Sequence, residues 1–449
     1  MTVIAYIVGV LVVALGVGLS IGLHEIGHLV PAKRFGVKVT QYMVGFGPTI
    51  WSRTRGETEY GIKAVPLGGY IRMIGMFPPK PGDDPTRLRA SSTGRFSQLM
   101  DQARQDSMDE VGPGDEHRVF YRLSVPKKVI IMLGGPTMNL VIAFVLFGGL
   151  LTLYGIPTAT PLISSVAACV PTTAPTATNP QPACAPGDPA SPATQAGLQA
   201  GDRIVSVNGT RVTAWDQVTP LIRAAAGSTL SLDVDRGGQQ VALQAPIAAL
   251  NRAAYVDSDK VKVDAAGTVV TERVGYLGAT PTAEQVKGTP AQVPGFVWNV
   301  FTQTASVVVN VPQKMVGVVQ AAFGSGERDR NGPISVVGVG RAGGEIAAAD
   351  LGADGTLAKI MTLLSLIASL NMALFVFNLI PLLPLDGGHV AGALWEGLKR
   401  HGARILGKAD PGHVDVAKAL PIAYTMALVL ISMSALLIYA DIVKPIKLF

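Results

Sequence analysis

The chain has 449 residues, of which 48% are hydrophobic and only 15% are charged, against about a quarter charged in soluble domains. The net charge is +6, but the basic residues are spread out and no patch interleaves them with aromatic residues, which argues against a nucleic-acid partner. Such a low charged fraction indicates long uncharged segments and therefore a membrane protein.

Four uncharged runs are long enough to cross a membrane, since about 20 apolar residues span the hydrocarbon. The first is not a signal peptide, because it lacks a positively charged start and its apolar run is too long. We therefore expect four transmembrane helices, at 3–31, 129–155, 360–383 and 419–441.

Basic residues predict the orientation of these spans. Lys33, Arg34 and Lys38 follow the first span, and five more basic residues separate the third from the fourth. The positive-inside rule places both loops in the cytoplasm. The N-terminus and residues 156–359 then lie outside; Lys444 runs mildly against this assignment.

The first cytoplasmic segment alternates apolar and polar residues over 41–76, with glycine breaks. This pattern predicts short strands joined by turns. Residues 78–92 are rich in Pro, Asp and Ser and predict a linker. Residues 95–110 predict a short amphipathic surface helix, to which we assign no function.

The region after the second span begins with an irregular stretch, 168–190, that contains Cys169 and Cys184. Their spacing allows either a disulfide or two free thiols. Residues 191–212 predict a helical turn, a strand and a turn at Asn208-Gly209, and further strands are expected at 229–235 and 240–246. Residues 295–323 are almost uncharged and predict either a fifth span or a surface helix.

His24, Glu25 and His28 form an H-E-x-x-H motif at the end of the first span. Residues four apart lie on one face of a helix, so both imidazoles can reach one ion. Zinc favours such nitrogen ligands and lowers the pKa of its bound water, from which the intervening glutamate can take a proton. Ionisable groups within a membrane span are costly and therefore indicate function.

The third metal ligand is predicted to be Asp386, which follows the long uncharged run of the third span. The glycine pair after it is expected to let the backbone turn, and Pro381 and Pro384 are expected to bend the helix there. His389 is the alternative ligand, but we expect a structural role for it.

Topology restricts the number of crossings. The histidine pair and Asp386 each follow a span, and they can meet only if both spans end on the same side of the membrane. One intervening crossing satisfies this condition, whereas a second crossing at 295–323 would separate them. We therefore expect 295–323 to be a surface or re-entrant helix.

Taken together, HEIGH in the first span, GGPTMN at 134–139, SPATQAGLQAGDRIVSVNG outside and NLIPLLPLDGG in the third span resemble the site-2 protease family of intramembrane zinc metalloproteases, in its bacterial branch. The resemblance implies a bacterial inner-membrane enzyme that cleaves single-pass membrane proteins, such as anti-sigma factors, after a first cleavage. It implies that Asn139 binds substrate or stabilises the oxyanion, or else serves helix packing. One departure appears, since two leucines separate Pro381 from Pro384.

The resemblance also implies a membrane-associated β-hairpin within 41–76 and one extracytoplasmic α/β PDZ domain, a module that binds chain ends or extended peptides. The predicted fold is a polytopic α-helical membrane protein carrying these two elements. Its segments are a first span at 1–31, a cytoplasmic segment at 32–128, a second span at 129–155, the PDZ domain at 156–248, a linker with a surface helix at 249–358, a third span at 359–398, a cytoplasmic loop at 399–418, and a fourth span with the C-terminus at 419–449.

The predicted function is peptide hydrolysis with Zn²⁺ bound by His24, His28 and Asp386, with Glu25 as general base and the active site near the cytoplasmic side. Its partners are membrane protein substrates and lipid. One rival is a non-proteolytic PDZ scaffold with a structural metal, but such a site needs no base at Glu25. A zinc transporter is the other, but the chain has no His-rich loop. The sequence names neither the substrate, nor the scissile bond, nor the oligomeric state.

Overall fold

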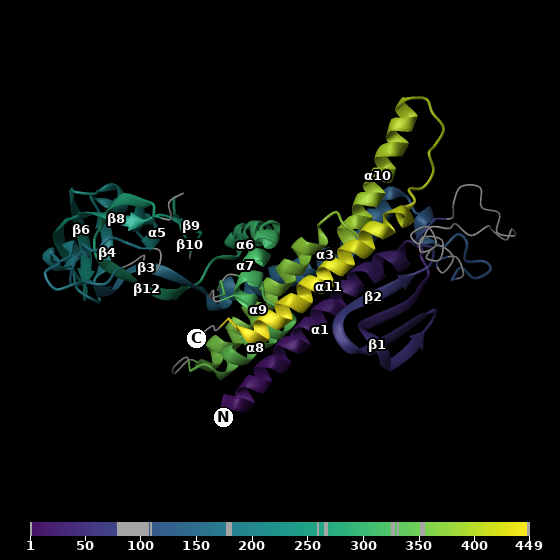
Figure 1. The fold of residues 1–449 in the computed structure, drawn as a ribbon, viewed down its shortest axis with the longest axis horizontal. Helices are drawn as coiled ribbons and strands as arrows, with labels where there is room; N and C mark the ends of the chain where they lie inside the picture. Colours follow the sequence, from purple (N-terminus) through teal and green to yellow (C-terminus); the bar gives the residue numbers. More distant parts are fainter. Residues whose placement is uncertain are drawn as a thin grey trace. The chain divides into compact units, whose positions relative to one another are not determined.

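A computed structural model describes residues 2–78, 107, 110–176, 182–257, 260–264, 268–324, 328–329, 332–350 and 355–446. The chain divides into two compact units, each described by itself (Figure 1). We call Met1–Thr152 together with Thr289–Phe449 the helical unit, and Leu153–Gly288 the inserted unit.

Among the described residues of the helical unit, four helices are long and apolar enough to cross a membrane: α1 (Thr2–Arg34), α3 (Val125–Gly149), α9 (Gly355–Asn378) and α11 (Leu420–Val443). The helix α3 continues as one π turn, Leu150–Tyr154. Their outward apolar side chains are exposed, as lipid-facing side chains would be. The prediction of a multi-pass helical membrane protein is confirmed.

Glycines allow the helix α1 to cross its neighbours at close range. A Cβ on Gly9 would lie 2.2 Å from the carbonyl oxygen of Gly343 in α8 (Val336–Ala348). A Cβ on Gly27 would lie 2.3 Å from the carbonyl oxygen of Gly134 in α3. Small residues at helix crossings let backbones pack closely, which is a main source of helix association in lipid.

One long hairpin, β1 (Val39–Arg55) and β2 (Thr58–Met73), occupies the region where shorter strands were predicted. Both strands bend, so that Tyr42 in the first half of β1 pairs with Tyr60 on one side and with Ile71 on the other. The last part of β2 therefore has a strand partner on only one side among the described residues.

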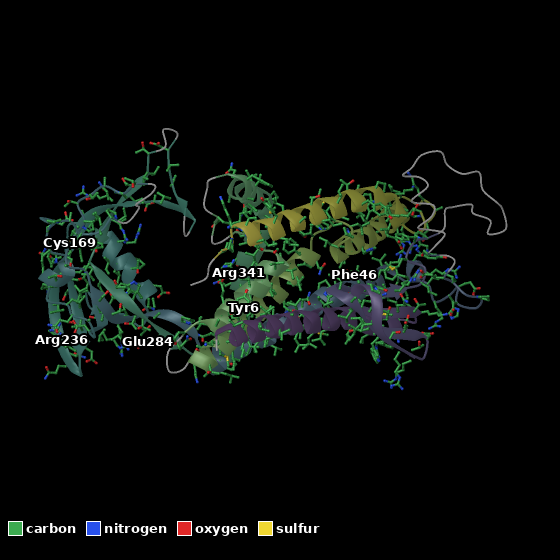
Figure 2. The ribbon with its side chains drawn as sticks, turned by 60° about the horizontal axis from the view of Figure 1, so that its bottom comes forward. Tyr6, Phe46, Cys169, Arg236, Glu284 and Arg341 are labelled. Carbon is green, nitrogen blue, oxygen red and sulfur yellow. A yellow bond between two sulfur atoms is a disulfide. The ribbon has the colours of Figure 1, made fainter. Side chains whose placement is uncertain are left out.

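The far half of the hairpin carries exposed apolar side chains, including Phe46, Ile50 and Trp51. Figure 2 places Phe46 toward the opposite end of the helical unit from Tyr6 of α1 and Arg341 of α8. Several large apolar side chains exposed on one hairpin indicate contact with a membrane or a partner.

The segment 295–323 forms two short helices, α6 (Val293–Val309) and α7 (Val311–Phe323), and neither is among the four candidate spans. The segment 359–398, expected to be one span, is instead two helices, because α9 ends at Asn378 and α10 (Asp386–Ile405) begins after a seven-residue loop. The predicted linker at 78–92 and helix at 95–110 lie outside the described residues, apart from Pro78, Ser107 and Glu110. Three 3-10 turns complete the helical unit: Phe120–Arg122, Pro290–Gln292 and Val416–Ala419.

The inserted unit is built on a sheet of strand order β12-β3-β4-β6-β7, with β5 paired to β4. Its elements are β3 (Ile156–Val166), α4 (Pro192–Gln195), β4 (Arg203–Val207), β5 (Thr210–Arg211), α5 (Trp215–Ala224), β6 (Thr229–Arg236), β7 (Gln239–Pro246), β8 (Ala248–Ala253), β9 (Tyr255–Asp257), β10 (Lys260–Val261), β11 (Thr271–Tyr276) and β12 (Ala279–Val286). Its core joins Ile163 of the sheet, Val218 and Ile222 of α5, and Leu277.

The compact unit continues beyond residue 248, the predicted end of the PDZ domain. The strand β12 pairs with β3 along its whole length, from Ala279 opposite Val166 to Val286 opposite Ile156. This pairing joins segments far apart in the sequence, so no local pattern reveals it. The compact unit therefore extends to Gly288.

Within this unit the strand β4 and the turn after it lie where the sequence predicted them. Asn208 and Gly209 both have positive φ, 48° and 76°, which suits the tight turn from β4 into β5. Cys169 and Cys184 form a disulfide, which decides between the two alternatives that the sequence left open.

Candidate metal centre

Two histidines one helical turn apart form the base of the site. His24 and His28 lie near the end of α1, with their Nε2 atoms 3.2 Å apart. His28 is 6% exposed. The helical spacing predicted from H-E-x-x-H therefore places both imidazoles on one face of the helix, where they can bind the same metal ion.

Asp386 completes a triangle of donor atoms. Its Oδ2 lies 3.3 Å from the Nε2 atom of His24 and 3.3 Å from that of His28. It accepts no hydrogen bond from any described residue. Zinc with ligand bonds of about 2.0–2.1 Å in tetrahedral geometry holds neighbouring ligand atoms about 3.3 Å apart. The three side chains therefore fit a zinc ion without rearrangement.

The helix α3 orients both rings. The Nδ1 atom of His28 lies 2.7 Å from the carbonyl oxygen of Ile131, and that of His24 lies 3.0 Å from the amide nitrogen of Asn139. Contacts of this kind fix the ring plane and leave Nε2 facing the third ligand. Asn139, predicted to contact substrate, is 1% exposed and lies against His24.

Two consecutive glycines bring α3 close to the donors. A Cβ on Gly134 would lie 2.0 Å from the carbonyl oxygen of Gly27, and a Cβ on Gly135 would lie 2.2 Å from the Nε2 atom of His28. Any larger residue at either position would displace α1 or the rings. The G-G-x-x-x-N pattern therefore combines close helix approach with the side chain that contacts His24.

Asp386 lies in the first turn of α10, where the positive end of the helix dipole favours a carboxylate. The expected backbone turn at the glycine pair does not occur, because Gly387 and Gly388 are helical. They allow close approach instead: a Cβ on Gly387 would lie 2.3 Å from the carbonyl oxygen of Ile380, and one on Gly388 would lie 2.5 Å from the nitrogen of Leu383.

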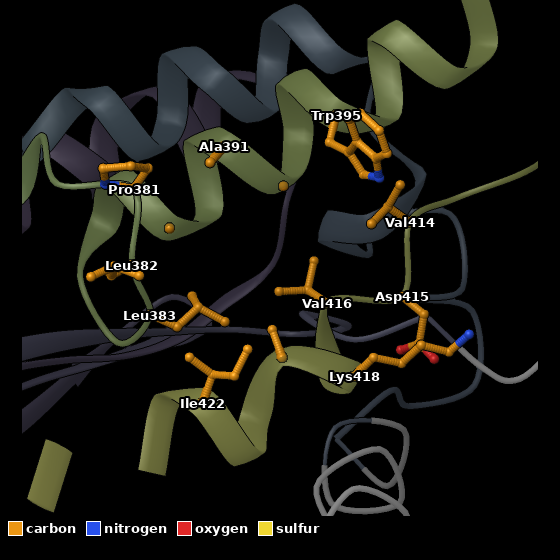
Figure 3. Close-up of a pocket in the computed structure, with 13 residues that line it drawn as sticks. Pro381, Leu382, Leu383, Ala391, Trp395, Val414, Asp415, Val416, Lys418 and Ile422 are labelled. Carbon is orange, nitrogen blue, oxygen red and sulfur yellow. The ribbon is translucent and has the colours of Figure 1, made fainter. Parts of the chain in front are cut away.

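The loop that leads to Asp386 also forms one wall of a pocket. The pocket has a volume of about 410 Å³ and lies between this loop, α10 and the start of α11. Figure 3 shows Leu383 and Ile422 near one another at its edge, with Trp395 at the far end. None of the three donor residues lines the pocket, so it is separate from the metal centre.

Glu25 lies beside the three metal-ligand side chains and is 7% exposed. The strand β2 passes next to this side chain. A Cβ on Gly69 would lie 2.9 Å from Cγ of Glu25, so the glycine allows the strand to pass next to this side chain. The hairpin therefore supplies part of the site.

Among the described residues, His24, His28 and Asp386 are the one group of His, Cys, Asp and Glu that could hold a metal ion. His389, the alternative considered from the sequence, is not part of it. Sequence reasoning missed the contributions of Ile131, Gly135 and Gly69, which are backbone or steric roles with no chemical signature of their own.

A membrane-spanning bundle that buries an H-E-x-x-H pair against a carboxylate defines a membrane metallopeptidase. The model of peptidase family M50 matches residues 12–405, and the chain belongs to this family. It is 31% identical to zinc metalloprotease Rip1 of Mycobacterium bovis, over 99% of both chains, and 32% identical to Rip1 of Mycolicibacterium smegmatis, over 98% of this chain and 99% of the relative. Zinc metalloprotease RasP of Geobacillus kaustophilus is 24% identical over 83% of this chain and 86% of its own. The prediction of a zinc metalloprotease is confirmed.

Proposed function

We propose that this protein hydrolyses peptide bonds in or near the transmembrane helix of single-pass membrane proteins, after a first protease has shortened their outer part. Zinc is held by His24, His28 and Asp386, and Glu25 is the general base. The donor triangle carries the proposal, because three ligand atoms lie 3.2–3.3 Å apart beside a buried carboxylate at the end of an apolar span.

The chemistry follows from these residues. Zinc, when bound, polarises the scissile carbonyl and makes water easier to deprotonate. Glu25 takes the proton from the attacking water and passes it to the leaving amine. The carbonyl oxygen of Ile131 holds the His28 ring in place. The rival function, a scaffold with a structural metal, leaves Glu25 without a role.

The substrate must unwind before it is cut, because a helical backbone keeps its carbonyls hydrogen-bonded. The last part of β2 supports a route for this. It has a strand partner on only one side among the described residues, and its Gly69 lies next to Glu25. An unwound substrate segment that adds to this strand would lie next to the general base.

The charge pattern supports a location in the bacterial inner membrane with the metal centre near the cytoplasmic side. Lys33 and Arg34 end α1 shortly after His28, and Lys408 and Lys418 precede α11. The inserted unit then lies outside, where a PDZ-like domain can exclude substrates that still carry a bulky outer part. Anti-sigma factors are substrates of the expected kind.

Cleavage by the purified protein in lipid nanodiscs tests the proposal. The substrate is a single-pass protein whose outer part has been removed. We expect mass spectrometry to place the cut in or near its transmembrane helix, and we expect a chelator to stop cleavage and zinc to restore it. Cleavage that resists the chelator, or that falls only in soluble segments, would contradict the proposal.

A further inference from the structure

Asn139 is a buried amide with one unpaired atom. It lies within α3 and is 1% exposed. Its amide nitrogen is 3.0 Å from the Nδ1 atom of His24, and its Oδ1 accepts no hydrogen bond from any described residue. In this orientation the amide N–H would donate to Nδ1 of His24, which requires a ring that carries its proton on Nε2.

To bind a metal through Nε2, His24 needs the other tautomer. Its Nε2 faces the other two ligand atoms, and a nitrogen binds a cation through its lone pair. The proton of the neutral ring must then be on Nδ1, which needs an acceptor. The nitrogen and oxygen of an amide exchange places by a half turn. With a metal on Nε2, Oδ1 of Asn139 therefore faces the Nδ1–H group of His24.

His28 shows the same arrangement without a choice of orientation. Its Nδ1 is 2.7 Å from the carbonyl oxygen of Ile131, and a carbonyl can only accept. The proton is therefore on Nδ1, and Nε2 is free for the metal. Since Ile131 and Asn139 both belong to α3, this helix presents one acceptor to each histidine.

We propose that Asn139 is a positioning residue that holds His24 in the Nδ1–H tautomer, with Nε2 toward the metal, and that it does not stabilise the oxyanion of the substrate. The inference rests on the proposed zinc site. An oxyanion donor would have to present its N–H groups to substrate, whereas the Asn139 side chain is 1% exposed.

Two substitutions separate these roles. Asn139→Leu keeps the approximate volume but removes the acceptor, so zinc affinity should fall by about 10–100-fold, as for other partners of metal-bound histidines. Asn139→Asp keeps an acceptor for the Nδ1–H group and should retain zinc affinity within a few fold. If Asn139 instead donated to the oxyanion, both variants would keep the zinc affinity of the wild type. Asn139→Asp would then have the lowest cleavage rate, because it adds negative charge beside the oxyanion.

The measurement is competition for zinc between a chelating dye and the purified full-length chain in detergent. Asn371→Leu is the matched control, because Asn371 is also 1% exposed and its amide donates to Ser20, 2.9 Å away, without contacting the histidines. We expect its zinc affinity to equal that of the wild type. If Asn139→Leu does not fold, Asn139→Ala replaces it.

Equal zinc affinity in wild type and Asn139→Leu would overturn the positioning role while leaving the proposed function intact. Loss of affinity in folded Asn139→Asp would also overturn it. Failure of the wild-type protein to bind zinc would overturn the proposed function and this inference together, so the two failures are distinguishable.

Discussion

The two units use buried charge differently. In the inserted unit, Asp202 is 1% exposed, and Arg236 donates to both of its oxygens at 2.7 Å. The backbone N–H of Gln199 adds a third hydrogen bond, at 2.8 Å. In the helical unit, Oδ2 of Asp386 meets only two ring nitrogens and accepts no hydrogen bond from the described residues. A fully satisfied buried carboxylate stabilises its own fold, whereas an unsatisfied one among ligand atoms indicates a bound ion.

The helical unit also contains buried charges that are paired internally. Lys128 lies 2.9 Å and 3.0 Å from the two carboxylate oxygens of Glu396, and Arg328 pairs with Asp441. The first pair links α3 to α10, and the second links the segment before α8 to α11. Location in the helical unit therefore does not by itself mark a functional charge.

The largest effect is expected for Asp386→Ala. The variant should lose stoichiometric zinc and all detectable cleavage, because only the ring nitrogens of His24 and His28 remain to bind the metal. Elemental analysis of the purified protein and the nanodisc assay measure both. His389→Ala serves as the control, since His389 is outside the donor group, and it should retain zinc. Zinc retained in Asp386→Ala but lost in His389→Ala would show that the third ligand is wrongly assigned.

Glu25→Gln should separate metal binding from chemistry. Its zinc content should stay at the wild-type level, because Glu25 is not in the donor group. Cleavage should fall by about 10²–10⁴-fold, the usual contribution of a general base. Substantial cleavage by a zinc-loaded variant would remove Glu25 from the mechanism.

Gly135→Ala tests how closely α3 must approach the rings. The added Cβ would lie 2.2 Å from Nε2 of His28 and displace it. We expect weaker zinc binding and about 100-fold slower cleavage, as for misplacements of about 1 Å in other sites. Gly18→Ala in α1 is the matched control, because nothing lies within 4 Å of its Cβ position. Equal zinc affinity in the two variants would refute the steric argument.

Arg236→Met should affect the inserted unit and leave zinc binding unchanged. Hydrogen bonds from the Arg236 guanidinium hold the pKa of Asp202 below its usual value. Because the folded pKa is lowered, the ion pair stabilises the unit above the unfolded value of about 3.9 and loses this effect as the pH falls through the lower folded pKa.

Hydrogen exchange of β4 and β6 in the full-length chain measures this effect. We expect faster exchange in Arg236→Met at neutral pH and a smaller difference from wild type as the pH falls below about 4. Arg203→Met is the control, because Arg203 and Glu284 form an exposed pair, which contributes little. A difference between wild type and Arg236→Met that grows as the solution is acidified would contradict the sign of the pKa shift.

Removal of 156–286 should have the smallest effect on the chemistry. Ile156 and Val286 are paired across β3 and β12, so a short Gly-Ser linker can join the cut ends. We expect unchanged zinc content, cleavage of a pre-trimmed substrate within a few fold, and new cleavage of untrimmed substrate. Loss of activity in a folded, zinc-loaded variant would show that the inserted unit helps to assemble the site.

Local sequence determined the parts of this protein that depend on short-range periodicity. Uncharged runs of sufficient length revealed the spans, because the thickness of the bilayer sets their length. The spacing of His24 and His28 predicted that both side chains lie on one face of a helix and can bind one metal ion, because a helix repeats every 3.6 residues. The turn at Asn208-Gly209 followed from the tolerance of these residues for positive φ.

Tertiary structure alone decided the contacts between distant segments. It placed Asp386, and not His389, against the histidines, and it brought the carbonyl of Ile131 and the amide of Asn139 to the two rings. It also extended the inserted unit to Gly288 through the pairing of β12 with β3. These contacts depend on backbone atoms and on the absence of side chains at glycines, which leave no periodic or chemical signal in the sequence.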